Sequence, residues 1–467
     1  MRPCPASRLL VLFLALAPAA ALAGPTPALL ERAESLFRQY LAIDTTNPPG
    51  REMSAARFLA GVLEKEGLEP RILDLGGERA NLIARLRGTG SKRPVILLHH
   101  MDVVPAAPAR WTSPPFGGKV VDGHLVGRGT VDIKGKGIID LMTMLHMARL
   151  GRPLSRDFVF LAVADEECDS LGSRRMVAEH AELIRDAEFL IDEGGEVRAR
   201  AGGRPVAYLV AIGEKIPLWL TVTFSGKAGH GSEPDPDSAV NRLVRAAKRL
   251  EGWRTPPRLR PELKEHVRLL LRDRKLEGLP GWTGDFASSA HSPAFLDAIA
   301  RLDTEVNAAV RDTVSLTGLR AGEKINTIPG QASMTLDCRL FPDTPTKAFQ
   351  DELRRVLADP TATIRLEDTA SDGPRPGPSR VDSDFMRALT QVAARRDPGV
   401  PVVPFVMLSS NDSTFYRPLG IQAYGFEYYR LTEDERSSSH GDDERLSLES
   451  FRDGLRLACE LMEELSR

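Results

Sequence analysis

The sequence predicts an α/β protein in which a mostly parallel sheet with flanking helices carries an inserted α+β domain. Between residues 95 and 195, short apolar runs alternate with helix-period segments, a pattern that indicates right-handed βαβ units. From about residue 213 the order is strand, helix, strand, strand, helix, strand, the split βαβ arrangement of a ferredoxin-like domain. The α/β pattern resumes after a Pro- and Gly-rich linker at 372–378. We therefore expect a larger domain made of 24–212 and 372–467, with 213–371 inserted between them.

The first 23 residues are interpreted as a secretory signal peptide. Arg2 and Arg8 form a basic start, residues 9–16 are apolar, and Ala21-Leu22-Ala23 is a small-residue cleavage site. The alternative is an uncleaved N-terminal anchor, although this apolar run is short for a stable membrane span. No later segment is apolar enough to span a bilayer. The expected location is secreted or periplasmic.

Apolar periodicity predicts the remaining elements in order. In the larger domain it predicts helices at 28–43 and 53–66, separated by Pro48-Pro49-Gly50, a strand at 95–98, a helix at 135–150, strands at 158–163 and 189–191, and a final helix at 448–466. In the inserted domain it predicts strands at 218–224, 313–319, 332–340 and 362–366, and helices at 238–251, 262–272 and 346–357.

Charge and cysteine content exclude several classes of function. The chain has 62 basic and 64 acidic residues, so it offers no reason to expect nucleic acid or an anionic membrane as a partner. After residue 23 the cysteines are Cys168, Cys338 and Cys459, a set too sparse for a disulfide framework. The absence of a Cys-x-x-Cys motif argues against a thiolate zinc site.

Acidic and imidazole side chains follow three of the predicted strands. His100 and Asp102 follow the first, Asp165-Glu166-Glu167 the second and Asp192-Glu193 the third, and Asp132 lies in a Gly-Arg-Gly turn between the first two. Parallel strands bring such side chains to one edge of a sheet. A lone His-x-Asp or a pair of glutamates is usually only a polar strand end or a solvated helix face. Three strand ends together predict a two-metal site, for zinc or for cobalt or manganese.

The motifs carry a resemblance to a known family. The chain resembles the dinuclear zinc hydrolases that include aminoacylases, glutamate carboxypeptidases, acetylornithine deacetylases and succinyl-diaminopimelate desuccinylases. The matching motifs are LHHMDVVP (98–105), GRGTVDIKG (127–135), DEE (165–167), DEG (192–194), GHGS (229–232), NTIP (326–329) and SHG (439–441). The long segment 254–312 favours the branch of carboxypeptidase S and N-acyl-amino-acid hydrolases over the compact desuccinylases.

The resemblance implies a role for each matching position. Two zinc ions per subunit would be held by His100 and Glu193 on one side and by Glu167 and His440 on the other. Asp132 would bridge the ions across a cis peptide to Ile133. Glu166 would act as the base, and Asp102 would orient His100. Asp192 is the alternative to Glu193 as a ligand. The metal-binding and catalytic residues that the resemblance implies are therefore His100, Asp102, Asp132, Glu166, Glu167, Glu193 and His440.

The resemblance also implies substrate contacts from the inserted domain, which would then act as a lid. His230 would reach the partner's active site in a homodimer and donate to the developing oxyanion. Asn326 would contact the oxyanion region, and Arg339 the substrate carboxylate, which a guanidinium can bind bidentately. For His230 and Arg339 the alternatives are a surface histidine in a Gly-rich turn and an exposed sheet cation. Residues 409–413 depart from the family's Gly-Thr/Ser-Asp loop.

The expected activity is metal-dependent hydrolysis of an amide bond adjacent to a free carboxylate. The expected substrate is a small peptide, cleaved as by a carboxypeptidase or dipeptidase, or an N-acyl amino acid. One alternative is a deacylase dedicated to a single biosynthetic intermediate, which a signal peptide disfavours because such intermediates are cytoplasmic. The other is a metal-free binding module of the same fold, which intact candidate ligands disfavour.

Overall fold

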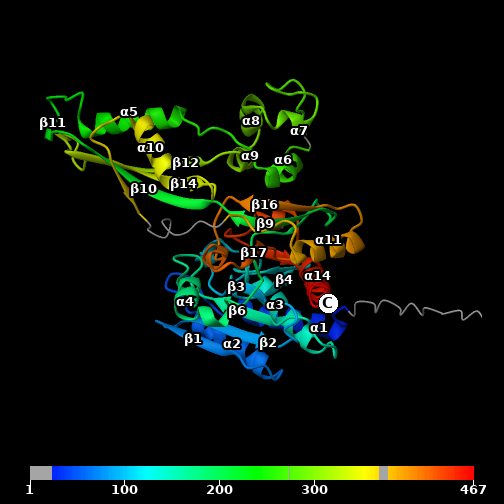
Figure 1. The fold of residues 1–467 in the computed structure, drawn as a ribbon. Helices are drawn as coiled ribbons and strands as arrows, with labels where there is room; N and C mark the ends of the chain where they lie inside the picture. The colour runs from blue at the N-terminus through cyan, green and yellow to red at the C-terminus, as the bar shows by residue number, and fades with distance from the viewer. Residues whose placement is uncertain (1–23, 273, 368–376) are drawn as a thin grey trace, which may run out of the picture.

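The computed structural model describes residues 24–272, 274–367 and 377–467. The predicted signal peptide at 1–23, and most of the predicted linker at 372–378, lie outside the described residues. Figure 1 shows a large α/β body that combines the blue to green N-terminal part of the chain with the orange to red C-terminal part, and the green to yellow inserted segment extends from one side of it.

The large body is built on a mixed sheet with a parallel centre. Within the described residues the strand order is β1-β2-β6-β3-β7-β17-β9-β8-β18, with β16 beside β9. β3 runs parallel to both β6 and β7, and β7 runs parallel to β17. The antiparallel pair of β1 and β2 forms one edge. The strands are β1 (Arg71–Gly76), β2 (Arg79–Leu86), β3 (Val95–His100), β6 (Phe158–Val163), β7 (Phe189–Asp192), β8 (Val197–Ala199), β9 (Pro205–Glu214), β16 (Val402–Met407), β17 (Gln422–Gly425) and β18 (Arg430–Leu431).

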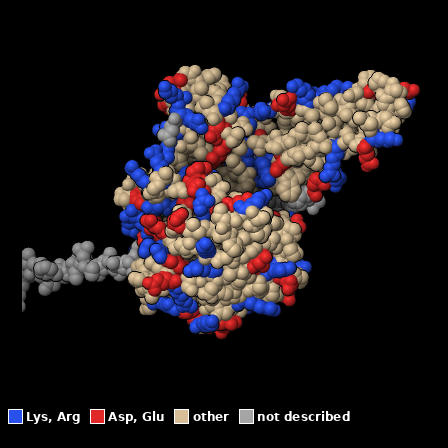
Figure 2. All heavy atoms as spheres, turned by 180° about the vertical axis from the view of Figure 1, so that it is seen from behind, with Lys and Arg blue, Asp and Glu red and all other residues tan. Residues whose placement is uncertain are grey.

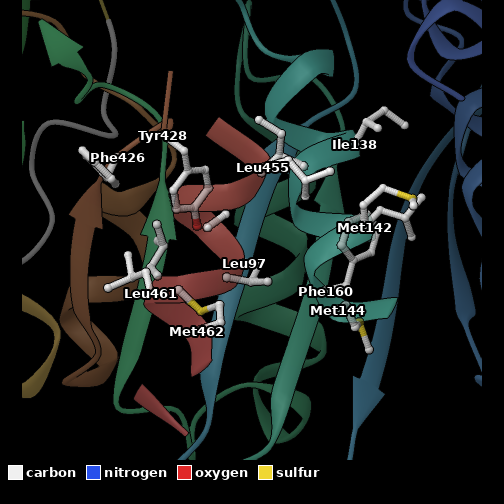
Figure 3. Close-up of a cluster of buried hydrophobic side chains, with 14 of the residues drawn as sticks. Leu97, Ile138, Met142, Met144, Phe160, Phe426, Tyr428, Leu455, Leu461 and Met462 are labelled. Carbon is white, nitrogen blue, oxygen red and sulfur yellow. The ribbon is translucent and has the colours of Figure 1, made fainter. Parts of the chain in front are cut away.

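Helices cover both faces of this sheet, which confirms the predicted fold class. Alternate strand residues point to opposite faces, so Leu97 packs into one core and Ile96 and Leu98 into another. Figure 3 shows the first core, where α3 and α14 meet the sheet around Leu97 and Phe160. The helices of the body are α1 (Pro27–Leu41), α2 (Glu52–Glu64), α3 (Lys134–Ala148), α4 (Leu171–Glu179), α11 (Asp384–Arg396), α12 (Ser413–Tyr416), α13 (Glu433–Arg436) and α14 (Leu448–Leu465).

The inserted segment contains a four-stranded antiparallel sheet in the order β12-β14-β10-β15. Two helices cover one of its faces, and Leu218, Leu220, Val222 and Phe224 alternate into the core beneath them. β12 lies at an edge of this sheet. The elements are β10 (Ile216–Ser225), α5 (Ala239–Gly252), β12 (Thr313–Ala321), β14 (Gln331–Leu340), α10 (Thr346–Leu357) and β15 (Thr363–Leu366).

Residues 254–312 form a separate helical subdomain with its own apolar core. We predicted a single helix here, at 262–272. The described residues of this segment, 254–272 and 274–312, form four: α6 (Lys264–Leu271), α7 (Phe286–Ser289), α8 (Pro293–Ala300) and α9 (Thr304–Ala309). The others are short and follow Asp or Ser N-caps at Asp285, Ser292 and Asp303, so they leave little periodicity to read. Figure 1 shows this subdomain above β16, which α6 contacts.

Smaller elements complete the described chain. They are the pair β11 (Gly229–His230) and β13 (Thr327–Ile328), the three-stranded group β4 (Lys119–Val121), β5 (His124–Val126) and β19 (Arg445–Ser447), and short 3-10 turns. Every helix in the described residues is too short or too polar to cross a bilayer. Figure 2 shows acidic and basic side chains interspersed over one face, consistent with the near-neutral net charge.

Candidate dinuclear metal centre

Two histidines face the two oxygens of a single carboxylate at the carboxyl edge of the large sheet. His100 Nε2 lies 3.0 Å from Asp132 Oδ1, and His440 Nε2 lies 3.0 Å from Asp132 Oδ2. Each histidine has a second acidic neighbour: Glu193 Oε2 is 3.8 Å from His100 Nε2, and Glu167 Oε2 is 3.2 Å from His440 Nε2. Asp132 thus lies between two imidazole–carboxylate pairs, the arrangement of a carboxylate that bridges two ions.

These residues come from distant parts of the chain. His100 ends β3, Glu193 directly follows β7, and Glu167 lies in the loop after β6. Asp132 precedes α3 and is joined to Ile133 by a cis peptide bond. His440 lies in the loop between α13 and β19. The structure therefore brings together all five positions for which the resemblance implies metal binding.

The donor set fits a pair of metal ions. Ligand atoms of His100, Glu166 and Glu193 lie within 4.8 Å of one another, as do those of His100, Asp132 and Glu167. Glu167 Oε1 is buried and has no hydrogen-bond partner among the described residues. Imidazole nitrogens and carboxylate oxygens suit zinc, and also cobalt or manganese. A cation would satisfy this orphaned oxygen and offset the repulsion among the acids.

Burial and the close approach of several carboxylates shift the pKa values of His440, His100 and Glu166. Hydrogen bonds to Asp132 and Glu167 raise the pKa of His440 to about 10. Burial lowers the pKa of His100, but the neighbouring carboxylates of Asp102, Asp132 and Glu193 outweigh it and raise that pKa well above its usual range. Burial, followed by repulsion from Glu193, raises the pKa of Glu166 well above its usual range. The partly buried Glu166 carboxyl is therefore suited to hold a proton.

Asp102 makes contacts beyond the expected one with His100. Its carboxylate accepts hydrogen bonds from the backbone N–H groups of Glu166 and Glu167, both at 3.1 Å. Asn47 Nδ2 donates to the same carboxylate at 2.8 Å. His100 Nδ1 lies 3.0 Å from the Asp102 backbone carbonyl and 3.6 Å from its carboxylate. The Asp102 side chain therefore holds the loop of Glu166 more directly than it orients His100.

Asp192 and Glu193 point to different partners. Asp192 is buried and accepts hydrogen bonds from the backbone N–H and the hydroxyl of Ser413, at 3.0 and 2.9 Å. Asn411 donates to the backbone carbonyl of Glu193 at 3.0 Å. The loop at 409–413 thus stabilises the turn at Asp192 and Glu193 through hydrogen bonds. The Glu193 side chain faces His100 and the candidate metal ligands.

The three candidate substrate contacts do not meet the cluster within one chain. His230 is exposed on β11, and its Nδ1 lies 2.7 Å from Ser232 Oγ. Asn326 is beside it, since its carbonyl accepts from Gly231 N at 2.8 Å. Arg339 on β14 pairs with Asp337 at 2.8 Å. Figure 1 shows β11 at the far tip of the inserted domain, away from β3.

A cavity of about 540 Å³ opens beside Asp132 and Glu193. Its walls include Glu305 of the helical subdomain and several apolar residues. The apolar residues are Val131, Ile133, Leu209, Phe405, Met407, Leu408 and Leu431. Sequence reasoning missed this wall because the apolar residues of β16 are indistinguishable from core. It also missed Asn47, whose position before Pro48-Pro49 marked only a turn.

Comparison with known proteins gives a consistent family assignment. The model of peptidase family M20/M25/M40 matches residues 96–464. "Probable carboxypeptidase S-like 2" of Dictyostelium discoideum is 29% identical over 371 residues, which cover 78% of this chain and 70% of that protein. "N-fatty-acyl-amino acid synthase/hydrolase PM20D1" of Xenopus tropicalis is 30% identical over 366 residues, covering 77% and 70%.

A solved structure shares the fold. The M20 family metallo-carboxypeptidase Sso-CP2 from Sulfolobus solfataricus superposes with a TM-score of 0.67 at 18% identity, covering 92% of this chain and 98% of that one. These matches confirm the resemblance inferred from the motifs. The chain belongs to peptidase family M20/M25/M40 and is a hydrolase that acts on amide bonds.

Proposed function

We propose that this chain is a secreted or periplasmic hydrolase that uses two zinc ions to cleave an amide bond next to a free carboxylate. The substrate is a small peptide or an N-acyl amino acid. The main observation in support is that one carboxylate oxygen of Asp132 faces His100 and the other faces His440. Glu193 lies beside His100, and Glu167 lies beside His440. The names of the relatives, a carboxypeptidase-like protein and an N-fatty-acyl-amino acid hydrolase, support this substrate class.

In this proposal His100 and Glu193 would hold one ion, Glu167 and His440 would hold the other, and Asp132 would offer a carboxylate oxygen to each. When bound, the ions polarise the substrate carbonyl and make water more acidic. Glu166 takes a proton from the attacking water and passes it to the leaving amine. Its raised pKa suits this role, since a carboxyl that binds protons more strongly is a better base and can carry the proton between steps.

Substrate binding in this proposal uses the cavity beside the cluster and the inserted domain. The apolar wall of the cavity accepts the apolar part of the substrate. His230 donates to the developing oxyanion, with Asn326 beside it, and Arg339 binds the substrate carboxylate. Because His230 lies far from the cluster of its own chain, it has to act on a partner subunit or after a large closure of the lid.

We propose a homodimer formed through the inserted domain. β12 is an edge strand of that sheet and can pair with its copy in a second subunit. Apolar side chains are exposed on β12, with Leu319 57% and Leu316 43% exposed, and on α5, with Val244 57% exposed. A dimer would cover this apolar surface. The basic, apolar and small-residue pattern of residues 1–23 supports export of the protein.

The test is hydrolysis of a panel of dipeptides and N-acyl amino acids by the wild type and by Glu166→Ala, with zinc content measured for each. We expect the variant to keep two zinc ions per subunit and to lose about 10²- to 10⁴-fold in kcat. Glu182→Ala, a change to an exposed glutamate in the turn after α4, is the matched control and should turn over normally.

The outcomes separate the parts of the proposal. Normal turnover by a zinc-loaded Glu166→Ala variant would exclude Glu166 as the base. A wild type that binds no metal would exclude metal-dependent hydrolysis and favour a binding module. Cleavage of a single biosynthetic acyl intermediate, with no activity on peptides or other N-acyl amino acids, would favour the dedicated deacylase.

A further inference from the structure

The Glu444 carboxylate is fully buried and accepts four hydrogen bonds from one turn. Oε1 accepts from the backbone N–H groups of Val131 and Asp132, at 2.8 and 3.1 Å. Oε2 accepts from Gly129 N at 3.1 Å and from the Arg128 guanidinium at 2.6 Å. The side chain is 0% exposed, so water does not compete for these bonds. One carboxylate thus organises the whole turn that ends at Asp132.

The same contacts connect this turn to the loop of His440. Glu444 lies four residues after His440, and its backbone carbonyl accepts from Gly127 N at 2.9 Å. Arg128 extends the connection, since its second guanidinium nitrogen donates to the His440 carbonyl at 3.2 Å. The Asp132 turn and the His440 loop are more than 300 residues apart in the chain, and Glu444 fixes their relative position.

The backbone of the turn depends on this support. Gly129 has φ +88°, and a Cβ there would lie 2.8 Å from a side-chain carbon of Val103. Position 129 therefore requires glycine. Three backbone N–H groups of the turn point towards the Glu444 carboxylate. Removal of the acceptor would leave those N–H groups buried without a partner and the Arg128 charge buried without a counter-ion.

We propose that Glu444 is a positioning residue for metal binding, which sets the distance between Asp132 and His440 and thereby the geometry of the bridged pair of ions. This inference rests on the proposed metal centre. Because Asp132 serves both ions, displacement of its turn weakens both sites together. Outer partners that orient metal ligands typically account for about 10- to 100-fold in metal affinity, and we expect a loss of that size.

The experiment is a titration of metal-free protein with Co²⁺, followed by visible absorption, so that binding is read without substrate. Glu444→Gln keeps the size of the side chain but places an amide donor against N–H donors. Glu444→Asp keeps the charge opposite Arg128 but is shorter by one methylene. Glu435→Gln is the matched control: Glu435 is also buried and accepts from Ser447 N and from the backbone and hydroxyl of Thr432, without touching the Asp132 turn.

We expect the wild type and Glu435→Gln to bind two Co²⁺ ions with equal affinity, and both Glu444 variants to fold and to bind both ions about 10- to 100-fold more weakly. Two ions bound at wild-type affinity in a Glu444 variant would overturn the inference while leaving the proposed function intact. The same weakening in Glu435→Gln, or failure of both Glu444 variants to fold without metal, would reduce Glu444 to a structural residue. A wild type that binds no Co²⁺ would overturn both proposals.

Discussion

A buried histidine makes the docking of the helical subdomain sensitive to pH. His266 on α6 is 3% exposed and packs on Phe405 of β16, with the ring centroids 5.0 Å apart. Neither of its ring nitrogens has a hydrogen-bond partner among the described residues. Burial, with a smaller contribution from the Arg198 charge, lowers the pKa of His266 from 6.5 to about 3. The docked subdomain therefore holds a neutral imidazole at every pH above about 4.

The sign and size of the effect follow from proton linkage. Between pH 3 and 6.5 the undocked histidine binds a proton that the docked one does not, so docking becomes less stable as the pH falls. With these two pKa values the loss at pH 5 is about 2 kcal/mol relative to neutral pH. Glu305, whose carboxylate lies 3.7 Å from the imidazole, would offset part of it once His266 is protonated.

The perturbation is His266→Phe, which keeps the aromatic contact with Phe405 and removes the titration. The measurement is amide hydrogen exchange of α6, Lys264–Leu271, at pH 7.5 and pH 5, corrected for the intrinsic exchange rates. We expect the opening free energy of the wild type to fall by about 2 kcal/mol over this range, and that of the variant to stay constant. Equal falls in the two proteins would refute the assignment to His266. Since Phe405 lines the cavity, KM should rise more between pH 7.5 and pH 5 in the wild type than in the variant.

Two further predictions concern buried polar groups near the cluster. Asn47→Ala removes the donor to Asp102 and Asp165 and should lower the unfolding free energy, measured by urea denaturation, by about 3 kcal/mol. It should also lower kcat more than it changes KM, because the loop that carries Glu166 loses support. A normal kcat in the variant would contradict this. Lys136→Met leaves Asp140 buried without its 2.6 Å ion-pair partner and should cost about 3–5 kcal/mol, whereas Lys136→Met with Asp140→Leu should recover most of that loss. A double variant as unstable as the single one would show that the bonds of Lys136 to the carbonyls of Leu98 and Ile191 dominate.

The clustering of the candidate site could be predicted because its residues follow strong local signals. His100 ends one buried strand and Glu193 directly follows another, and their apolar runs predict a parallel sheet whose carboxyl edge collects polar side chains. His440 had no such signal of its own. Its position depends on contacts with Asp132 and Glu167, more than 250 residues earlier in the chain, so only the family resemblance could place it.

The supporting contacts could not be predicted from the sequence. Asp102 and His100 are two apart on a strand end, which predicts a side-chain pair, and their side chains lie 3.6 Å apart. The Asp102 carboxylate also accepts the N–H groups of Glu166 and Glu167, which the sequence does not indicate. These hydrogen bonds depend on how closely the loop after β6 approaches Asp102. The periodicity of the sequence gives no information about this distance. Glu444 was missed for the same reason. The position of Glu444, four residues after His440, does not indicate that it binds the Asp132 turn, because that turn lies more than 300 residues earlier in the chain.

The order of ligands along the chain explains why the inserted domain can be large without disturbing the centre. His100, Asp132, Glu167 and Glu193 all precede the insertion, and His440 follows it. β9, before the insertion, pairs with β16 and β17, which come after it, so the sheet itself closes the gap between the two halves. Glu444 then ties the last ligand loop to the Asp132 turn at close range. The candidate ligands are therefore all positioned within the large body, and the proposed action of His230 on a partner subunit would not disturb them.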